Sequence, residues 1–137
     1  GGPDVVDEVR DLQSALPGPD GLRFRIGVLP TRLGAAIAAL RDAGACVLTY
    51  PGLCLLYAGF RLAEGSGARA VNDIFREVDR VARDAGGEFV CESAPTWAKS
   101  GHEMFGARAE LMPIFRSLKQ RFDPGSVLNP GRFAGGI

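Results

Sequence analysis

The order of its periodic segments constrains this fold more than any other feature of the sequence. Residues 22–30 alternate apolar and polar side chains, which predicts a strand with one buried face. Residues 31–44 and 68–87 repeat their apolar residues at helical intervals and end in glycine, which predicts two amphipathic helices. Three further β-rich runs complete the pattern: 45–50, 53–62 and 88–93. The predicted order is therefore strand, helix, strand, strand, helix, strand.

That order is typical of the split βαβ, ferredoxin-like α+β sandwich, a four-stranded antiparallel sheet with helices on one face. Two flanking helices are expected as well, a lead-in helix at 5–16 and a last helix at 108–122. The last helix is expected to turn its apolar residues inward, namely Leu111, Ile114, Phe115, Leu118 and Phe122. At 137 residues, the chain is expected to form a single domain spanning 1–137.

Three local features refine this expectation. Thr31 is expected to cap the first helix, because its hydroxyl can accept a free backbone N–H. Pro51-Gly52 fits the central positions of a type II turn, which predicts a hairpin between the second and third strands. The sheet face away from the helices should carry Arg23 and Arg25, with whichever of Thr49, Tyr50 and Tyr57 share their direction.

Composition excludes several classes of function. The 16 Lys and Arg balance 16 Asp and Glu, whereas nucleic-acid-binding modules normally carry a basic surplus. No apolar run reaches the roughly 20 residues of a spanning helix, and the first residues lack a signal-peptide pattern, so we expect a soluble, cytoplasmic chain. Its three cysteines have no C-x-x-C spacing, which predicts buried free thiols and no metal site.

Two weaker motifs leave alternatives open. Residues 65–70, GSGARA, formally match the dinucleotide-binding pattern, but the strand before them belongs to a hairpin, which favours a plain connection. His102, the only histidine, precedes Glu103 in a glycine-punctuated loop. An acid–base role for His102 competes with an ordinary hydrogen-bonded loop position, because no partner residue is evident from the sequence.

The end of the chain carries the most specific pattern. In "FDPGSVLNPGRF", residues 122–133, two proline-glycine turns follow the last predicted helix. Chain ends are poorly ordered unless something ties them down, so this stiffening predicts an anchored tail. The second turn presents Arg132 and Phe133. The residue chemistry leaves two interpretations open, a tail held on its own domain and a functional arginine.

The segment LKQRFDPGSVLNPGRF resembles the C-terminal signature of FAD-linked oxidases of the vanillyl-alcohol oxidase class, and is most similar to the FAD-binding subunits of bacterial glycolate oxidases. In that class a lysine-bearing helix leads into F-D-P, a spacer and N-P-G-R or N-P-G-K. Further stretches show the same likeness across nearly the whole chain: VVDEVRDLQSALPGPDGLRFRIGVLP, TYPGLCLL, VARDAGGEFVCESAP and GHEMFG. Phe105 departs from the pattern, which has tryptophan there.

The resemblance implies that this chain is only the cap of a flavin-dependent 2-hydroxy acid oxidase or dehydrogenase. An N-terminal domain absent from this chain would bind most of the FAD. The candidate cofactor-binding residues are then Asn129, Gly131 and Arg132, and the substrate-side candidates are His102, Arg23 and Arg25. The resemblance also implies other oxidase subunits as partners, one of them an iron–sulfur subunit, which could hold the protein at the inner membrane.

A second interpretation keeps the same fold with a different function. Ferredoxin-like domains serve many unrelated purposes, so the chain could be a freestanding ligand-binding or regulatory module without catalysis. The tail pattern favours the oxidase cap, since a regulatory module has no evident use for F-D-P followed by N-P-G-R. In either case, we expect the isolated chain to be inactive as an oxidase.

Overall fold

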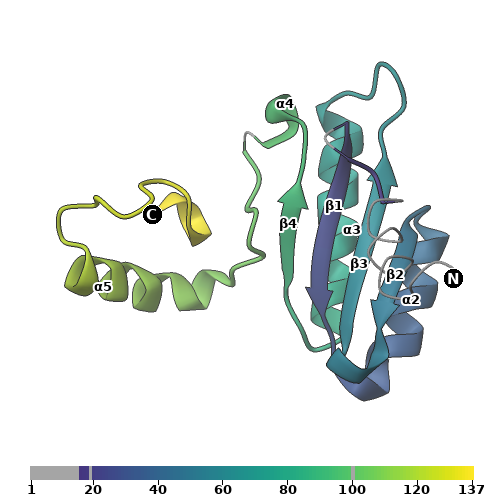
Figure 1. The fold of residues 1–137 in the computed structure, drawn as a ribbon, viewed down its shortest axis with the longest axis horizontal. Coiled ribbons are helices and arrows are strands. Elements are labelled where there is room, and N and C mark those ends of the chain that lie inside the picture. The colour runs from purple at the N-terminus through teal and green to yellow at the C-terminus, as the bar shows by residue number, and fades with distance from the viewer. Residues whose placement is uncertain (1–15, 19, 100) are drawn as a thin grey trace, which may run out of the picture.

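The computed structural model describes residues 16–18, 20–99 and 101–137. Four strands, β1 (Gly21–Gly27), β2 (Cys46–Tyr50), β3 (Leu55–Arg61) and β4 (Phe89–Ser93), form one sheet in the order β2-β3-β1-β4 (Figure 1). Every neighbouring pair is antiparallel. The predicted α+β class and the split βαβ order are therefore confirmed. The predicted lead-in helix lies outside the described residues, apart from its last position.

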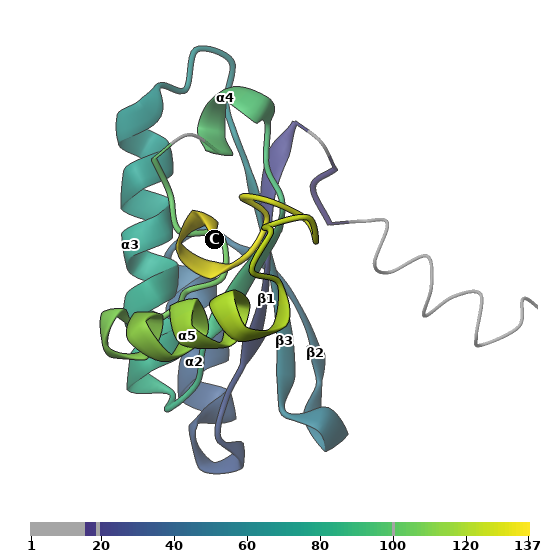
Figure 2. The ribbon, with the colours of Figure 1, turned by 90° about the vertical axis from the view of Figure 1, so that its left-hand side faces the viewer.

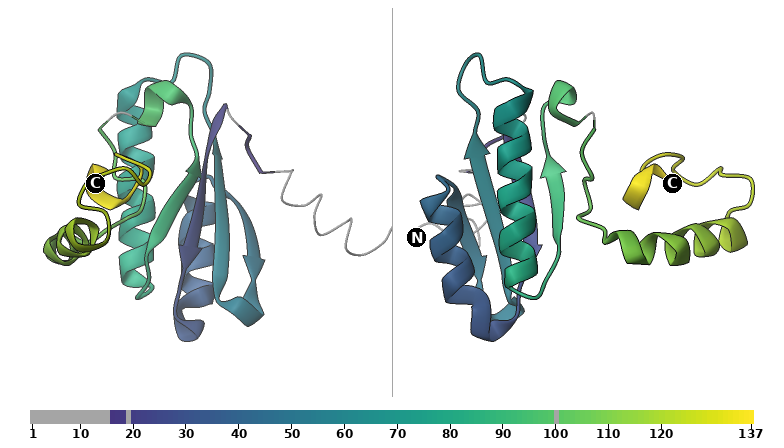
Figure 3. Two further views of the ribbon diagram at one scale, coloured as in Figure 1. Left: turned by 60° about the vertical axis from the view of Figure 1, so that its left-hand side comes forward. Right: turned by 180° about the vertical axis from the view of Figure 1, so that it is seen from behind.

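The two crossing helices, α2 (Leu33–Asp42) and α3 (Ala68–Asp84), cover the same face of the sheet (Figures 2 and 3). The core lies between these helices and the sheet. Phe24 on β1 has no exposed surface, and its ring makes edge-to-face contacts with Phe75 at 5.0 Å, Phe89 at 5.7 Å and Phe60 at 6.0 Å. Burial of such a side chain contributes about 1.5–3 kcal/mol.

Both crossing helices end as predicted, but the first begins differently. Gly44 and Gly86 take left-handed conformations, with φ of +86° and +70°, which glycine adopts without steric cost. The prediction that Thr31 caps α2 is wrong. Residues Pro30–Arg32 form a 3-10 turn, and α2 starts behind it without any side-chain cap. Pro30 explains the difference, since its fixed φ starts the turn before Thr31.

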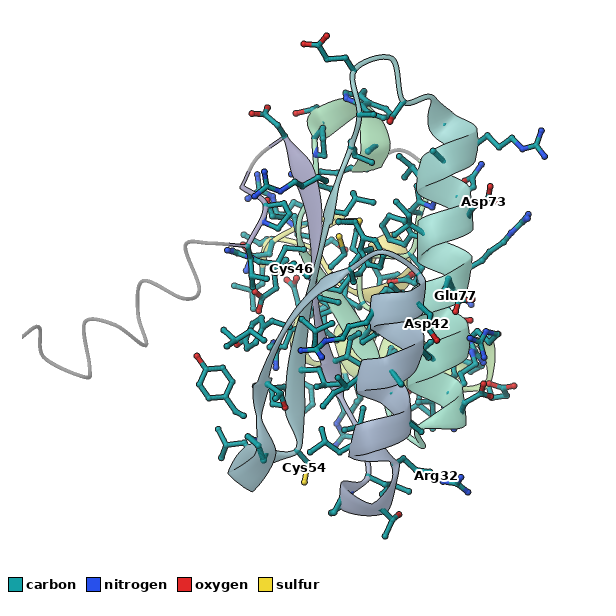
Figure 4. All side chains as sticks on the ribbon, turned by 90° about the vertical axis from the view of Figure 1, so that its right-hand side faces the viewer. Arg32, Asp42, Cys46, Cys54, Asp73 and Glu77 are labelled. Carbon is teal, nitrogen blue, oxygen red and sulfur yellow. The ribbon has the colours of Figure 1, made fainter. Side chains whose placement is uncertain are left out.

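The predicted hairpin is confirmed, but its turn is longer than a two-residue type II turn. Tyr50 pairs with Leu55, so four residues connect β2 to β3. Pro51–Leu53 form a 3-10 turn, and Cys54, with φ of 51°, takes the left-handed conformation expected of Gly52. Figure 4 shows Cys54 at this end of the sheet.

Strand register decides which residues occupy the open face of the sheet. Arg25 pairs with Tyr57, which in turn pairs with Leu48, so these three side chains share the face away from the helices. Arg23 and Tyr50 lie two residues from Arg25 and Leu48 on their strands, and therefore point to the same face. The rings of Tyr50 and Tyr57 meet edge-on at 5.9 Å. Thr49 pairs with Leu56, a core residue, and therefore belongs to the helix-covered face.

The C-terminal arm, residues 108–137, lies beyond the β4 edge of the sheet, away from β2 (Figure 1). It contains a short 3-10 turn and α5 (Met112–Phe122), whose Pro113 occupies the first turn as predicted. The prediction that the last helix turns its apolar residues inward is wrong for three of the five: Leu111 and Phe115 are half-buried, but Ile114, Leu118 and Phe122 are exposed. No residue of α5 is buried, and the side chains of Ile114, Leu118 and Phe122 are 55%, 48% and 75% exposed.

The three cysteines are free, but only Cys91 is buried. Burial raises the pKa of the Cys91 thiol to about 12, so it remains protonated near neutral pH. Cys46, at the start of edge strand β2, is exposed, which corrects the expectation of three buried thiols. None of the described helices is both long enough and apolar enough to cross a membrane.

Candidate functional site

The loop of residues 101–107 runs closely along the outer edge of β4. The Cys91 N–H donates to the Met104 carbonyl at 2.6 Å, so this loop satisfies part of the free strand edge. A Cβ at Gly106 would lie 2.8 Å from the Phe89 ring, which explains why the position carries glycine. His102 stacks on Phe75 of α3, with ring centroids 4.2 Å apart. The loop is therefore fixed on both sides.

Asp123 organises the turn that follows α5. Its carboxylate accepts the backbone N–H groups of Val127 and Leu128, both at 2.9 Å, and pairs with Lys119 Nζ at 2.6 Å. Lys119 also donates to the Leu128 carbonyl at 2.6 Å. The hydrogen bond from Lys119 and those from the two backbone amides hold the pKa of Asp123 below its ordinary value. The F-D-P segment is thus a hydrogen-bonded turn.

The N-P-G-R segment forms a second turn that reverses the chain. Asn129 and Gly131 take left-handed conformations, with φ of 46° and +71°, and the Arg132 N–H donates to the Asn129 carbonyl at 3.1 Å. Phe133 then lies between Phe105, at 5.8 Å, and Phe115 of α5, at 5.5 Å. The predicted anchored tail is confirmed, and its anchor includes both the loop and α5.

A hollow of about 740 Å³ opens between the tail and the loop, and we call it the tail hollow. It is lined by Glu92, Lys99, His102, Glu103, Met104, Phe105, Gly131, Arg132, Phe133 and Gly136. The structure therefore brings together three of the candidates expected from sequence: His102, Gly131 and Arg132. Asn129 is exposed and does not line the hollow.

Arg23 and Arg25 lie on the open face of the sheet, where both approach Glu92. Arg25 Nε donates to Glu92 Oε1 at 3.0 Å, and Arg23 Nε lies 3.6 Å from Glu92 Oε2. A second hollow of about 280 Å³ is lined by Leu16, Arg23, Tyr57 and Glu92. Glu92 lines both hollows, so its carboxylate links the two arginines on the open face to the tail hollow.

The tail hollow has the chemistry of a site for a planar or anionic group. Lys99 and Arg132 supply two cationic side chains, and Phe105 and Phe133 supply apolar walls. Two carboxylates also line the hollow, but Glu92 is paired with Arg25 and Glu103 accepts two backbone N–H groups. Among the described residues, no group of three or more His, Cys, Asp or Glu side chains is placed to hold a metal ion. Lys99 and Arg132 are therefore the lining side chains suited to an organic anion.

Sequence reasoning did not identify Glu92 or Lys99, and it treated Glu103 only as a neighbour of His102. Lys99 lies on the short helix α4 (Thr96–Lys99), which no periodicity signals. Another hollow, of about 190 Å³, lies between α2 and α3. Four alanines dominate its lining, and its Arg80 and Asp84 are paired with each other, so it offers little for chemistry.

Comparisons of the chain with protein-family models, with curated proteins and with solved structures find no match.

Proposed function

We propose that this chain is the cap, or substrate-side, domain of a flavin-dependent 2-hydroxy acid oxidase or dehydrogenase of the glycolate-oxidising type. The observation that carries the proposal is the geometry of the tail. The two turns of "FDPGSVLNPGRF" return Arg132 to the tail hollow beside His102 and Lys99. A tail that served only to brace its own domain would have no need for a cation at this position.

The exposed apolar surface of the C-terminal arm supports a missing domain. Ile114, Leu118 and Phe122 form one stripe along α5, and Val127 and Leu128 of the following turn are 78% and 63% exposed. Contiguous apolar surface of this kind marks interaction sites in proteins. A freestanding regulatory module would leave that stripe in water, whereas a cap would bury it against the FAD-binding domain.

The residues of the tail hollow fit FAD as a cofactor held mainly by the missing domain. The flavin would supply hydride acceptance from the hydroxyl-bearing carbon of the substrate. Arg132 and Lys99 would bind an anionic group and hold it in place, and Phe105 and Phe133 would exclude water. Asn129 and Gly131 would shape the turn at the junction between the two domains.

The substrate-side roles of the remaining candidates follow from their positions. His102 lines the tail hollow and is half-buried against Phe75, so it would contact substrate from the side of the loop. Arg23 would act from the open face of the sheet through the hollow that it lines with Glu92, and Arg25 would act through its ion pair with Glu92. The proposed partners are the FAD-binding domain and further oxidase subunits, including an iron–sulfur subunit. These would place the protein in the cytoplasm, at the periphery of the inner membrane.

The test uses this chain and the full-length protein that contains it. We expect the full-length protein to carry FAD and to bleach its flavin absorbance when a 2-hydroxy acid is added without oxygen. We expect the isolated chain to be colourless and to bind FAD weakly at best, because the proposal gives most cofactor contacts to the other domain. A full-length protein without flavin, or an isolated chain that purifies with stoichiometric flavin, would contradict the proposal.

A further inference from the structure

We propose that Glu103 is the positioning residue that fixes Arg132 in the tail hollow. The role of Arg132 in substrate binding rests on the proposed function, but the contact made by Glu103 stands on geometry alone. Glu103 joins two parts of the chain that lie far apart in the sequence. Its Oε1 accepts the Phe105 N–H at 3.0 Å, and its Oε2 accepts the Gly135 N–H at 2.7 Å.

The two hydrogen bonds of Glu103 link the loop along β4 to the end of the tail, which we call the Glu103 bridge. One oxygen accepts a hydrogen bond within the loop, which fixes the direction of the carboxylate. The other oxygen accepts the hydrogen bond from the tail. Hydrogen bonds to a charged acceptor are shorter and stronger than neutral ones, so this carboxylate can fix the backbone of the tail where its side-chain packing alone would not set the position of each amide.

Arg132 is held from both directions along the chain. On one side, its own N–H donates to the Asn129 carbonyl at 3.1 Å. On the other side, the N–H of Gly135, three residues further along the chain, donates to Glu103 in the Glu103 bridge. Gly135 also packs closely on α5, because a Cβ there would lie 2.1 Å from Met112 Cε. Without the bridge, the backbone at Arg132 would depend on the turn at Asn129 and on the ring contacts of Phe133 for its position.

The bridge requires two acceptor atoms, which gives a test that hardly changes side-chain size. A carboxylate accepts on both oxygens, whereas a glutamine amide accepts on one and donates from the other. Glu103→Gln can therefore keep only one of the two bonds, and its NH₂ group would face an N–H donor at the other. Glu64→Gln is the matched control, because Glu64 is exposed in the connection between β3 and α3.

The first experiment measures the bridge in this chain by NMR. In Glu103→Gln we expect amide hydrogen exchange at Gly135 to accelerate about tenfold or more, as for loss of a hydrogen bond to a charged group. The heteronuclear NOE of the Arg132 amide should fall at the same time, because the backbone there becomes less ordered. The melting temperature should stay unchanged, since the arm lies outside the core. Glu64→Gln should change none of these quantities.

The second experiment asks whether Glu103 acts through Arg132 in the full-length protein. We expect Glu103→Gln to lower kcat/KM for the 2-hydroxy acid, and the double variant with Arg132→Ala to be no slower than Arg132→Ala alone. Independent, multiplicative losses would overturn the proposal, as would unchanged order at Arg132 in the first experiment. A full-length protein that oxidises no 2-hydroxy acid would overturn the proposed function, while the NMR measurement would still decide whether Glu103 positions Arg132.

Discussion

The helices α3 and α5 have similar sequence patterns and different surroundings. Both repeat apolar residues at i, i+3 and i+4 spacing. α3 buries five residues, including Phe75 and Val78, against the sheet, whereas α5 buries none. The difference shows that periodicity identifies residues that share a face of a helix, but does not tell whether the same chain covers that face.

The sandwich and the C-terminal arm consequently differ in what stabilises them. The sandwich depends on apolar burial around Phe24, whereas the arm depends on the ring contacts of Phe133 and on a few charge-assisted hydrogen bonds made by Asp123 and Glu103. Mutations in the sandwich should therefore change the free energy of unfolding, while mutations in the arm should change local order and function.

The largest expected effect lies at the centre of the sandwich. Phe24→Ala removes a fully buried ring with three aromatic neighbours, so we expect it to lower the free energy of unfolding by about 3–5 kcal/mol. Phe122→Ala removes the same side chain where it is 75% exposed, and should change that free energy by less than about 0.5 kcal/mol. Urea denaturation of both variants is the measurement. Similar losses would mean that α5 belongs to the cooperative core.

The next largest effect should appear in kinetics and not in stability. If Arg132 binds the substrate as proposed, Arg132→Ala in the full-length protein should lower kcat/KM by about thirty- to a hundredfold, or about 2–3 kcal/mol. The melting temperature of this chain should remain nearly constant. Lysine at position 132 should restore part of the rate if charge alone matters. Unchanged kinetics with a destabilised chain would show that Arg132 is structural.

A pair of strand glycines tests how closely the lead-in segment packs on the sandwich. A Cβ at Gly59 would lie 2.3 Å from Pro17 Cδ and 3.2 Å from Leu16 Cδ2, whereas a Cβ at Gly27 would meet nothing within 4 Å. Gly59→Ala should therefore cost about 1–3 kcal/mol of unfolding free energy. Gly27→Ala should be neutral or slightly stabilising, because alanine lowers the entropy of the unfolded chain. Equal effects in thermal melts would contradict this packing.

The smallest expected effect is an acid-induced loosening of the arm. Because the folded pKa of Asp123 lies below its ordinary value of about 3.9, its contribution is complete above that pH and is lost as the pH falls through the folded pKa. The heteronuclear NOEs of the Val127 and Leu128 amides should fall over that acidic range. In Asp123→Asn, these amides should be less ordered at neutral pH and lose this pH dependence. A titration curve that Asp123→Asn leaves unchanged would assign the transition to another carboxyl group.

Prediction from the sequence succeeded where the local pattern of residues and the packing of the core favour the same structure. The alternation around Phe24 and the glycine at the end of α3 were identified correctly, because each follows from backbone geometry within a few residues. The capping role of Thr31 and the type II turn at Pro51-Gly52 were wrong. Pro30 starts a 3-10 turn before Thr31, so Thr31 does not stand at the start of the helix. The pairing of Tyr50 with Leu55 leaves four residues in the hairpin connection, which is too long for a two-residue turn.

The sequence by itself determined the α+β class, the order of helices and strands along the chain, and the two stiff turns of the tail. Periodicity, proline and glycine act over short distances along the chain. Only the tertiary structure placed His102, Lys99 and Arg132 around one hollow, and only it revealed the bond from Glu103 to Gly135. Residues 103 and 135 meet because the loop follows the edge of β4, α5 leads the chain away from it, and the turns after α5 bring the tail back. No local pattern encodes such a contact, because its energy is gained only after the intervening segments have folded.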